Sequence, residues 1–456
     1  MMPISHLLQR EIVSTTELAN IIETQWDYKI LQTDICHVFI DDDYLNKILQ
    51  KWKNHINLEA ERISLYLQEK FMRDINKNYQ NIENVSWYHA ALIVELFKEC
   101  NICKNADILD ILKLQEIIAN QIQNNAIIFT IAWGQAKRCC GGLKTEGYYA
   151  DMAEFYSIGI LYLLTKAINI ISKLPIKIIV ITGGLRFQEA LFTDKRMIKK
   201  YDQQRQQIAD FFSDNSLHIA FKEYQSNSHK ILDNSSIANL YQNIASSKFQ
   251  TLLFNIDWYY VFTHATQSSF HNIKVPHSII EYVSNNLNIN ELIVMGIVAL
   301  INPTTHNFWQ TKFDKNIFID TVTFMNKITL ESTYKYISIH ETNKNIDTLH
   351  NSIRLSVHVK HDRNDIPAIY TLGAFSKNKL SQHHVTFLSH KNHVEFITAY
   401  QAKQNKYCAF FIKNTGKLSN KQLFSWLDKQ PLLYGDTQSL KLMETLSNIY
   451  LLKGTT

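Results

Sequence analysis

The sequence predicts an α/β protein with a mostly parallel sheet, helices on both faces of that sheet, and a helical N-terminal segment before it. Three observations predict this class. The first 120 or so residues place apolar side chains at helical spacing, residues 126–182 have the pattern of strand, helix and strand, and further short apolar runs follow. A strand, a crossover helix and a parallel strand form the βαβ unit, whose sheet needs cover on both faces.

The composition is that of a folded globular protein. The chain has 456 residues, 46% hydrophobic and 20% charged, and a formal net charge of +5. Such a chain can bury enough apolar surface to fold, and its length favours two or three domains, or one large domain with additions. No block of Lys and Arg indicates nucleic-acid binding, and no apolar run approaches the roughly 20 residues of a membrane span.

Targeting signals and cysteine spacing favour a cytoplasmic protein. The N-terminal residues lack the positive segment and apolar core of a secretory signal. Six cysteines in a chain of this length do not make a disulfide framework. Cys100 and Cys103 form a C-x-x-C, but no second pair completes a zinc site, so we expect plain thiols.

The N-terminal segment, residues 1–122, is expected to be helical. Apolar residues recur at helical spacing with charges between them. Three stretches show the pattern: Tyr44–Lys70, Trp87–Lys98 and Ile108–Ile122.

The βαβ unit comes next. The apolar run Ala126–Trp133 is rich in branched side chains and predicts a buried strand, and Gly134–Tyr149 predicts a polar loop. Asp151 is well placed to cap a long helix, which Pro175 ends. Ile176–Thr182 is the second predicted strand.

Later segments continue the α/β pattern. A helix is expected from Asp194 past Gln207, and further helices from Ser419 onwards. These boundaries suggest a central α/β domain at residues 123–385 and a C-terminal α/β extension at residues 386–456. The other predicted strands are His218–Phe221, Thr251–Ile256, Ser352–Val359, Ala368–Leu372, Val394–Thr398 and Tyr407–Ile412.

The loop after the first strand is a candidate anion site. Ligands of open α/β sheets bind beyond the carboxyl ends of the strands. Lys137, Arg138 and Lys144 lie in this glycine-containing loop, where backbone N–H groups and cations can surround a phosphate. The alternative is a solvated loop with scattered charge.

The loop after the second strand adds Thr182 and Arg186, and a guanidinium there could bind a carboxylate through two hydrogen bonds. Neither a P-loop nor a G-x-G-x-x-G is present, so a nicotinamide site has no support. Asp151 and Glu154 share one face at the start of the long helix. They are either a helix cap with a partner for the helix dipole, or part of a site.

A third cluster lies on a later strand. Alternation places Arg354, Ser356 and His358 on one face, which suits a lined pocket but also an exposed edge. His384 lies beyond another strand. No metal-ligand spacing is present, so we expect neither a metal nor another cofactor.

These clusters, in this order, resemble the isocyanide (isonitrile) synthase family of pyoverdine- and dityrosine-biosynthesis proteins. The family shows a Lys-containing loop, a D-x-x-E helix start, S-D-G-R-x-F after a strand, a tyrosine-bearing helix, R-L-S-I-H, and a W-H pair followed by Val. The resemblance runs from about Phe129 to Phe387. The corresponding stretches here are ADMAE at 150–154, IKIIVITGGLRF at 176–187, MIKKYDQQ at 197–204, RLSVH at 354–358 and HHV at 383–385.

The chain also departs from the family pattern. Gly183 replaces the Asp of S-D-G, and the Arg of that motif falls on Leu185, which leaves Arg186 one position late. His383 replaces the Trp of the W-H pair, and Val359 replaces the proline after R-L-S-I-H. The Phe-Pro lead into the lysine is missing, and residues 210–345 match poorly. These differences describe a distant member.

The resemblance implies a Rossmann-like fold and a cofactor-free condensation of an L-amino acid amine with the C2 carbonyl of ribulose 5-phosphate, which yields an isonitrile. It implies phosphate binding by Lys137, Arg138 and Lys144, and carboxylate binding by Arg186 or Arg354. Thr182 and Ser356 complete the expected substrate-binding set. A downstream oxygenase is a candidate partner. The expected proton-transfer residues are Asp151, Glu154, His358 and His384.

Two alternatives stay open. One is a relative that forms an amide or N-formyl product. The other is a binding module that keeps the pocket without catalysis, which the missing Asp at Gly183 favours.

Overall fold

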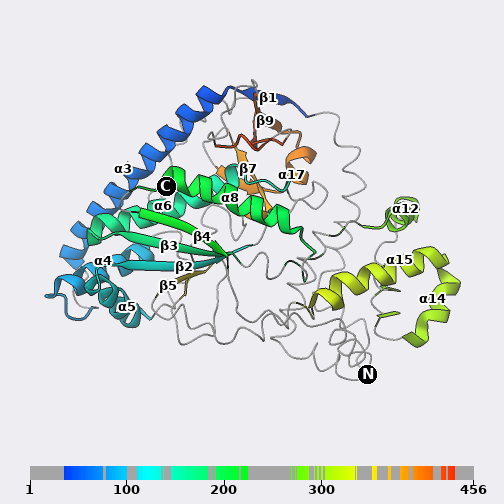
Figure 1. The fold of residues 1–456 in the computed structure, drawn as a ribbon, viewed down its shortest axis with the longest axis horizontal. Helices are drawn as coiled ribbons and strands as arrows, with labels where there is room; N and C mark the ends of the chain where they lie inside the picture. Colours follow the sequence, from blue (N-terminus) through cyan, green and yellow to red (C-terminus); the bar gives the residue numbers. More distant parts are fainter. Residues whose placement is uncertain are drawn as a thin grey trace.

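The computed structural model confirms the predicted fold class. Two sheets and a set of N-terminal helices make up most of the fold (Figure 1). The structure describes residues 35–74, 79–99, 110–134, 137, 145–182, 188, 190, 192–214, 217–223, 269, 273, 275–286, 292, 295, 296, 299, 300, 303–333, 335, 352–356, 368–370, 381–389, 394–413, 423–427 and 430–436.

The first sheet is all parallel, and its strand order is β4-β3-β2-β5-β6. The earliest strand, β2, lies in the middle; the chain adds β3 and β4 on one side and then returns to add β5 and β6 on the other. This is the doubly wound, Rossmann-like order. The bounds are β2 Ile127–Trp133, β3 Ile176–Thr182, β4 Leu217–Glu223, β5 Ile353–Ser356 and β6 Ala368–Tyr370.

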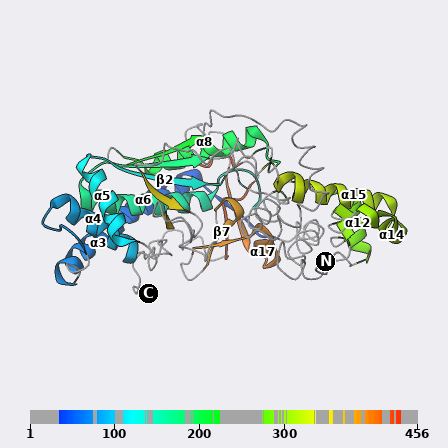
Figure 2. The same cartoon turned by 90° about the horizontal axis from the view of Figure 1, so that it is seen from below.

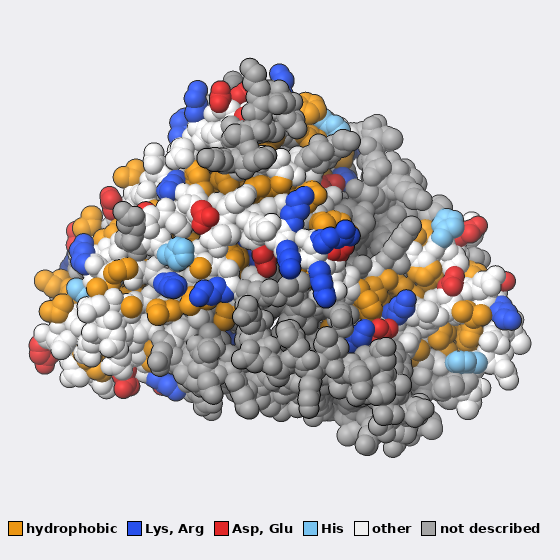
Figure 3. Space-filling model, in the orientation of Figure 1, with side chains coloured by type: hydrophobic (Ala, Val, Ile, Leu, Met, Phe, Trp, Pro, Cys, Tyr) orange, Lys and Arg blue, Asp and Glu red, His pale blue; other side chains and the backbone are white. Residues whose placement is uncertain are grey.

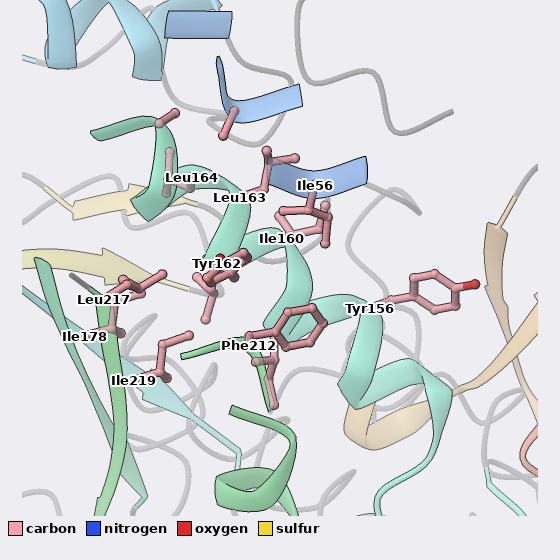
Figure 4. Close-up of a cluster of buried hydrophobic side chains, with 14 of the residues drawn as sticks. Ile56, Tyr156, Ile160, Tyr162, Leu163, Leu164, Ile178, Phe212, Leu217 and Ile219 are labelled. Carbon is pink, nitrogen blue, oxygen red and sulfur yellow. The ribbon is translucent and has the colours of Figure 1, made fainter. Parts of the chain in front are cut away.

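Helices α6 (Met152–Ser172) and α8 (Lys195–Phe212) connect the first three strands. Asp151 and Asp194 cap them, as the sequence predicts. Helix α6 has the length and apolar composition of a membrane span, but 83% of its most apolar window is buried, as in a core helix. Figure 4 shows its Ile160 and Tyr162 near side chains of α3, α8 and the sheet, whereas Tyr156 extends away from this group.

The N-terminal helices α3 (Asp42–Asp74), α4 (Val85–Glu99) and α5 (Ile111–Gln123) confirm the three predicted stretches. They share one hydrophobic core with α6 and the parallel sheet, because α3 and α4 contact α6 and α5 contacts β2. Figure 2 shows them on the same side of the molecule as the parallel sheet.

A second, mixed sheet joins the two ends of the described chain. Its order is β1-β9-β10-β7-β8, and β1 pairs in parallel with β9 across more than 360 residues of sequence. Strand β1 was not expected, because its four residues are too few to show a period. The bounds are β1 His37–Ile40, β7 Val385–Leu388, β8 Val394–Ile397, β9 Cys408–Ile412 and β10 Leu433–Gly435. A short helix, α17 (Ala399–Gln404), lies between β8 and β9.

The prediction of helices from Ser419 onwards is wrong for the described part of that stretch. Residues 423–426 form a turn, and β10 completes the second sheet. The predicted strand Thr251–Ile256 lies outside the described residues.

A second, smaller hydrophobic core was not predicted from the sequence. Its residues lie between β4 and β5 along the chain. It comprises helices α12 (His277–Asn286), α14 (His306–Lys312) and α15 (Lys315–Met325), with the π-helical turn η6 (Asn326–Glu331).

Candidate active site

The candidate site lies where the order of the parallel strands reverses. Strand β2 has β3 on one side and β5 on the other, so the strand order reverses between β2 and β5. Open α/β sheets bind their ligands at this switch point. The loop after β2 contains Lys137, and the start of α6 follows that loop.

Lys137, Asp151 and Glu154 form a buried ion triad. The Lys137 Nζ lies 2.8 Å from Asp151 Oδ1 and 2.7 Å from Glu154 Oε2. The three side chains are at most 1% exposed. The alternative of a solvated loop is therefore wrong for Lys137. We name this group the carboxylate–lysine triad.

The same two carboxylates cap α6. Asp151 Oδ1 accepts the backbone N–H of Ala153 at 2.8 Å, and Glu154 Oε2 accepts the N–H of Asp151 at 2.9 Å. These bonds form a complete capping box. The helix-cap interpretation is therefore confirmed, and the same two carboxylates also belong to the triad.

The charges in the triad do not balance. Two ionised carboxylates and one ammonium leave one excess negative charge in a site without water contact. Burial and the neighbouring Glu154 raise the pKa of Asp151 from 3.8 to about 7, although Lys137 opposes the shift. Burial alone would lower the pKa of Lys137, but the two carboxylates raise it, so Lys137 stays an ammonium. The Asp151 carboxyl, coupled to its neighbour, can therefore hold and release a proton near neutral pH.

Helix α8 supports the triad from the other side. The Tyr201 hydroxyl donates to Glu154 Oε1 at 2.8 Å, and burial, followed by Glu154, raises its pKa well above the ordinary value. Tyr201 is thus a neutral donor. Gln204 Oε1 accepts the N–H of Ala150, beside Asp151, at 3.0 Å.

Arg205, one residue further on α8, is fully buried. Its Nη1 donates to the Gly134 carbonyl at 3.1 Å, and it pairs with Asp202. The guanidinium carbon lies 4.5 Å from the Tyr201 ring centroid and 4.8 Å from that of Phe221. Arg205 therefore fixes the backbone where β2 ends and the lysine loop begins.

The segment before β7 also contacts the carboxyl end of β2. Trp133 Nε1 donates to Gln382 Oε1 at 3.1 Å, and a Cβ on Gly134 would lie 2.3 Å from Gln382 Nε2, so a side chain there would displace the Gln382 amide. Gln382 belongs to the turn η8 (Ser381–His383), which contacts α6. His384, half-buried, follows that turn. The structure thus brings the segment of His384 to the carboxyl end of β2.

Three other predicted residues lie near this edge. Thr182 ends β3 opposite Trp133, and its hydroxyl donates to the Lys222 carbonyl at 3.4 Å. Arg354 is half-buried on β5 opposite Thr130 of β2, and Ser356 ends β5. Arg138, Lys144, Arg186 and His358 lie outside the described residues and remain predictions. Within the described part of the chain, no three His, Cys, Asp or Glu side chains are grouped to hold a metal ion.

Exposed cations gather over the first turns of α8 (Figure 3). Lys200 Nζ donates to the Tyr149 hydroxyl at 3.2 Å and lies 4.4 Å from the centre of that ring. Because Tyr149 lies two residues before Asp151, this basic group borders the segment that carries the triad. We call it the α8 basic group; it consists of Lys195, Arg196, Lys199 and Lys200.

Sequence reasoning missed Gln204 and Arg205 and gave Tyr201 no role at the site. A signal was present: these polar residues occupy the helix positions that continue the buried face of Ile198 and Ile208. Polar residues at core-facing positions have hydrogen-bond partners, so they mark a buried network.

No protein-family model and no curated protein sequence matches the chain. The crystal structure of the PvcA protein from Pseudomonas aeruginosa is similar over 71% of this chain and 88% of that chain, with 14% sequence identity and a TM-score of 0.38. An identity this low assigns no residue of the site.

Proposed function

We propose that this protein is an isonitrile synthase-like enzyme that condenses an L-amino acid amine with a pentose phosphate, ribulose 5-phosphate. The observation that carries the proposal is the carboxylate–lysine triad at the switch point of the parallel sheet. Its members are the Lys-loop and D-x-x-E residues on which the family resemblance rests, and they lie in direct contact.

The proposed reaction needs repeated proton transfer. An amine that adds to a carbonyl must lose a proton, and the hydroxyl that leaves must gain one. A carboxyl pair that exchanges one proton near neutral pH suits both steps. We assign this exchange to Asp151 and Glu154 as a coupled pair. Lys137 neutralises the remaining negative charge, and Tyr201 orients the Glu154 carboxylate through its hydrogen bond. His384 and His358 are the further proton-transfer candidates.

The substrate anions need cations of their own. Because Lys137 is buried against two carboxylates, we assign the sugar phosphate to Arg138 and Lys144 of the same loop. The α8 basic group would attract the anion toward this edge. We assign the amino-acid carboxylate to Arg354, which lies on the strand beside β2, or to Arg186.

Mass spectrometry of the purified protein with each of the twenty L-amino acids and ribulose 5-phosphate tests the proposal. We expect one amino acid to give an isonitrile, captured with a tetrazine, only when both substrates are present. A product heavier by one water would instead indicate the formamide-forming relative. Ligand-induced thermal stabilisation without any product would indicate a binding module. Asp151→Asn is the control that keeps the helix cap and removes the titrating carboxyl.

The setting of the reaction also follows from the proposal. Under this proposal the enzyme acts in the cytoplasm, where sugar phosphates occur. The proposed reaction needs no cofactor. A downstream oxygenase acting on the isonitrile would be its pathway partner.

A further inference from the structure

The peptide group between Ala150 and Asp151 is hydrogen-bonded at both ends. Its carbonyl, on Ala150, accepts the indole N–H of Trp426 at 2.7 Å. Its N–H, on Asp151, donates to Glu154 Oε2 at 2.9 Å. Both groups belong to one conjugated unit, so a donor on the oxygen increases the polarity of the N–H. Trp426 is therefore linked to the Glu154 carboxylate through a single peptide group.

The same C-terminal segment holds the preceding loop at other points. Gln430 Nε2 donates to the Tyr149 carbonyl at 3.4 Å, and a Cβ on Gly147 would lie 2.1 Å from Gln430 Oε1. Past the peptide, the N–H of Met152 donates to the Leu432 carbonyl at 3.4 Å. The backbone on both sides of Asp151 is thus fixed by residues more than 275 positions later.

An ion pair attaches Glu146, earlier in this loop, to helix α17, which lies between β8 and β9. Lys403 Nζ lies 2.7 Å from Glu146 Oε1, and both side chains are at most 10% exposed. The Tyr434 hydroxyl donates to the same carboxylate. The loop therefore cannot shift without breaking buried polar contacts. These contacts keep the Trp426 indole within hydrogen-bond distance of the Ala150–Asp151 peptide group.

We propose that Trp426 is a positioning residue of the carboxyl pair, acting on Glu154 through the Ala150–Asp151 peptide group. The effect on turnover rests on the proposed function; the effect on the carboxylate does not. Among the described residues, the charged and titratable groups that face Glu154 are Lys137, Asp151 and Tyr201, with Arg205 behind Tyr201. Since the indole carries no charge, its influence must pass through the peptide.

The sign of the effect follows from which form the N–H stabilises. It donates to the charged form of Glu154, so weakening it favours the protonated form and raises the apparent pKa of the pair. Hydrogen-bond cooperativity of this kind is modest, and we expect a rise of about 0.2–0.5 pH unit.

Trp426→Phe removes the N–H and keeps an aromatic ring against Phe424, whose ring centroid lies 5.6 Å away. The isostere β-(3-benzothienyl)alanine, placed at position 426, also lacks the N–H but keeps the full indole shape. It serves as the second variant if Trp426→Phe folds poorly. The matched control is Trp309→Phe, because the half-buried Trp309 Nε1 has no hydrogen-bond partner among the described residues.

Two measurements decide the proposal. The first is ¹³C NMR titration of carboxyl-labelled Asp and Glu in the protein without substrate. We expect the apparent pKa of the pair to rise in both position-426 variants and to stay unchanged in Trp309→Phe. The second is the pH dependence of turnover, where kcat should fall about 1.6- to 3-fold on the acid side with KM unchanged, as a shift of about 0.2–0.5 pH unit requires.

A carboxyl titration in both position-426 variants that matches the unsubstituted protein would overturn the proposal, whatever happens to the melting temperature. A shifted titration in a protein that makes no isonitrile would support the positioning role and count against the proposed function instead.

Discussion

Replacement of Lys137 by Met should destabilise the protein in a way that grows with pH. The substitution keeps most of the side-chain volume and leaves Asp151 and Glu154 buried without a cation. Removing one partner of a buried pair costs about 3–5 kcal/mol. For a protein of this size we expect a fall in melting temperature of roughly 3–5 °C near neutral pH.

The pH dependence comes from the carboxyls. The folded pKa of Asp151 is raised above its unfolded value, so its contribution to stability is present below pH 3.8 and is lost as the pH rises through about 7. In Lys137→Met no cation remains beside the two buried carboxyls, so the folded variant binds about one more proton than the folded unsubstituted protein. The second carboxyl adds a penalty of about 1.4 kcal/mol per pH unit. The stability gap between the variant and the unsubstituted protein should therefore narrow by about 3 kcal/mol from pH 7 to pH 5.

Thermal melting at several pH values between about 5 and 8 measures this gap. The control is Lys166→Met. Lys166 lies on α6 and forms a partly exposed ion pair with Asp214, so its replacement should lower the free energy of unfolding by less than about 1 kcal/mol at every pH. The triple variant Lys137→Met, Asp151→Asn, Glu154→Gln should recover most of the loss, because no charge remains and Asn and Gln preserve the capping box. A deficit that is equal at pH 5 and pH 8, or no larger than that of Lys166→Met, would refute the reasoning.

Four further outcomes are expected. Glu154→Gln removes the like charge beside Asp151, so the acid limb of the pH–rate profile should move to lower pH. Turnover should also fall by about 10²–10⁴-fold. An acid limb that does not move would contradict the coupling between the two carboxyls. Asp151→Asn should abolish the ionisation near pH 7 in that profile, and its survival would assign it to another group. Turnover should be unaffected by EDTA; loss of activity restored by one divalent ion would reveal a metal requirement. Iodoacetamide, followed by peptide mapping, should label the exposed Cys36 well before Cys408, because burial and the neighbouring Cys36 raise the pKa of Cys408 to about 11; equal labelling would contradict that environment.

The parts of the fold that the sequence predicted are those encoded in short contiguous stretches. The run Ile176–Thr182 and the cap at Asp151 each depend on a few neighbouring residues, and both are confirmed. The pairing of β1 with β9 depends on residues such as Val38 and Phe410, which are far apart in sequence. Four residues show no reliable period, so such a strand is visible only once its partner is known.

The site divides in the same way. Topology and spacing pointed to the helix start and the strand-end loop that carry the triad. The contact between Lys137 and Glu154 could not be predicted, because it requires the loop to turn back and bury an ammonium that sequence alone assigns to phosphate. Trp426 gave no signal at all, since its role depends on the second sheet contacting a loop some 275 residues earlier.

The helix start shows why one residue pair can serve both structure and chemistry. The positive end of α6 and the backbone N–H of Ala153 stabilise an ionised Asp151, typically by 0.3–1 kcal/mol for the dipole (an order-of-magnitude figure). An ordinary exposed cap would therefore have a lowered pKa. Here burial and the charge of Glu154 outweigh the dipole and Lys137 together, and the pKa rises to about 7. A capping box on the surface stores no proton, whereas the same box enclosed with one lysine and one tyrosine becomes a group that titrates where an acid–base catalyst must.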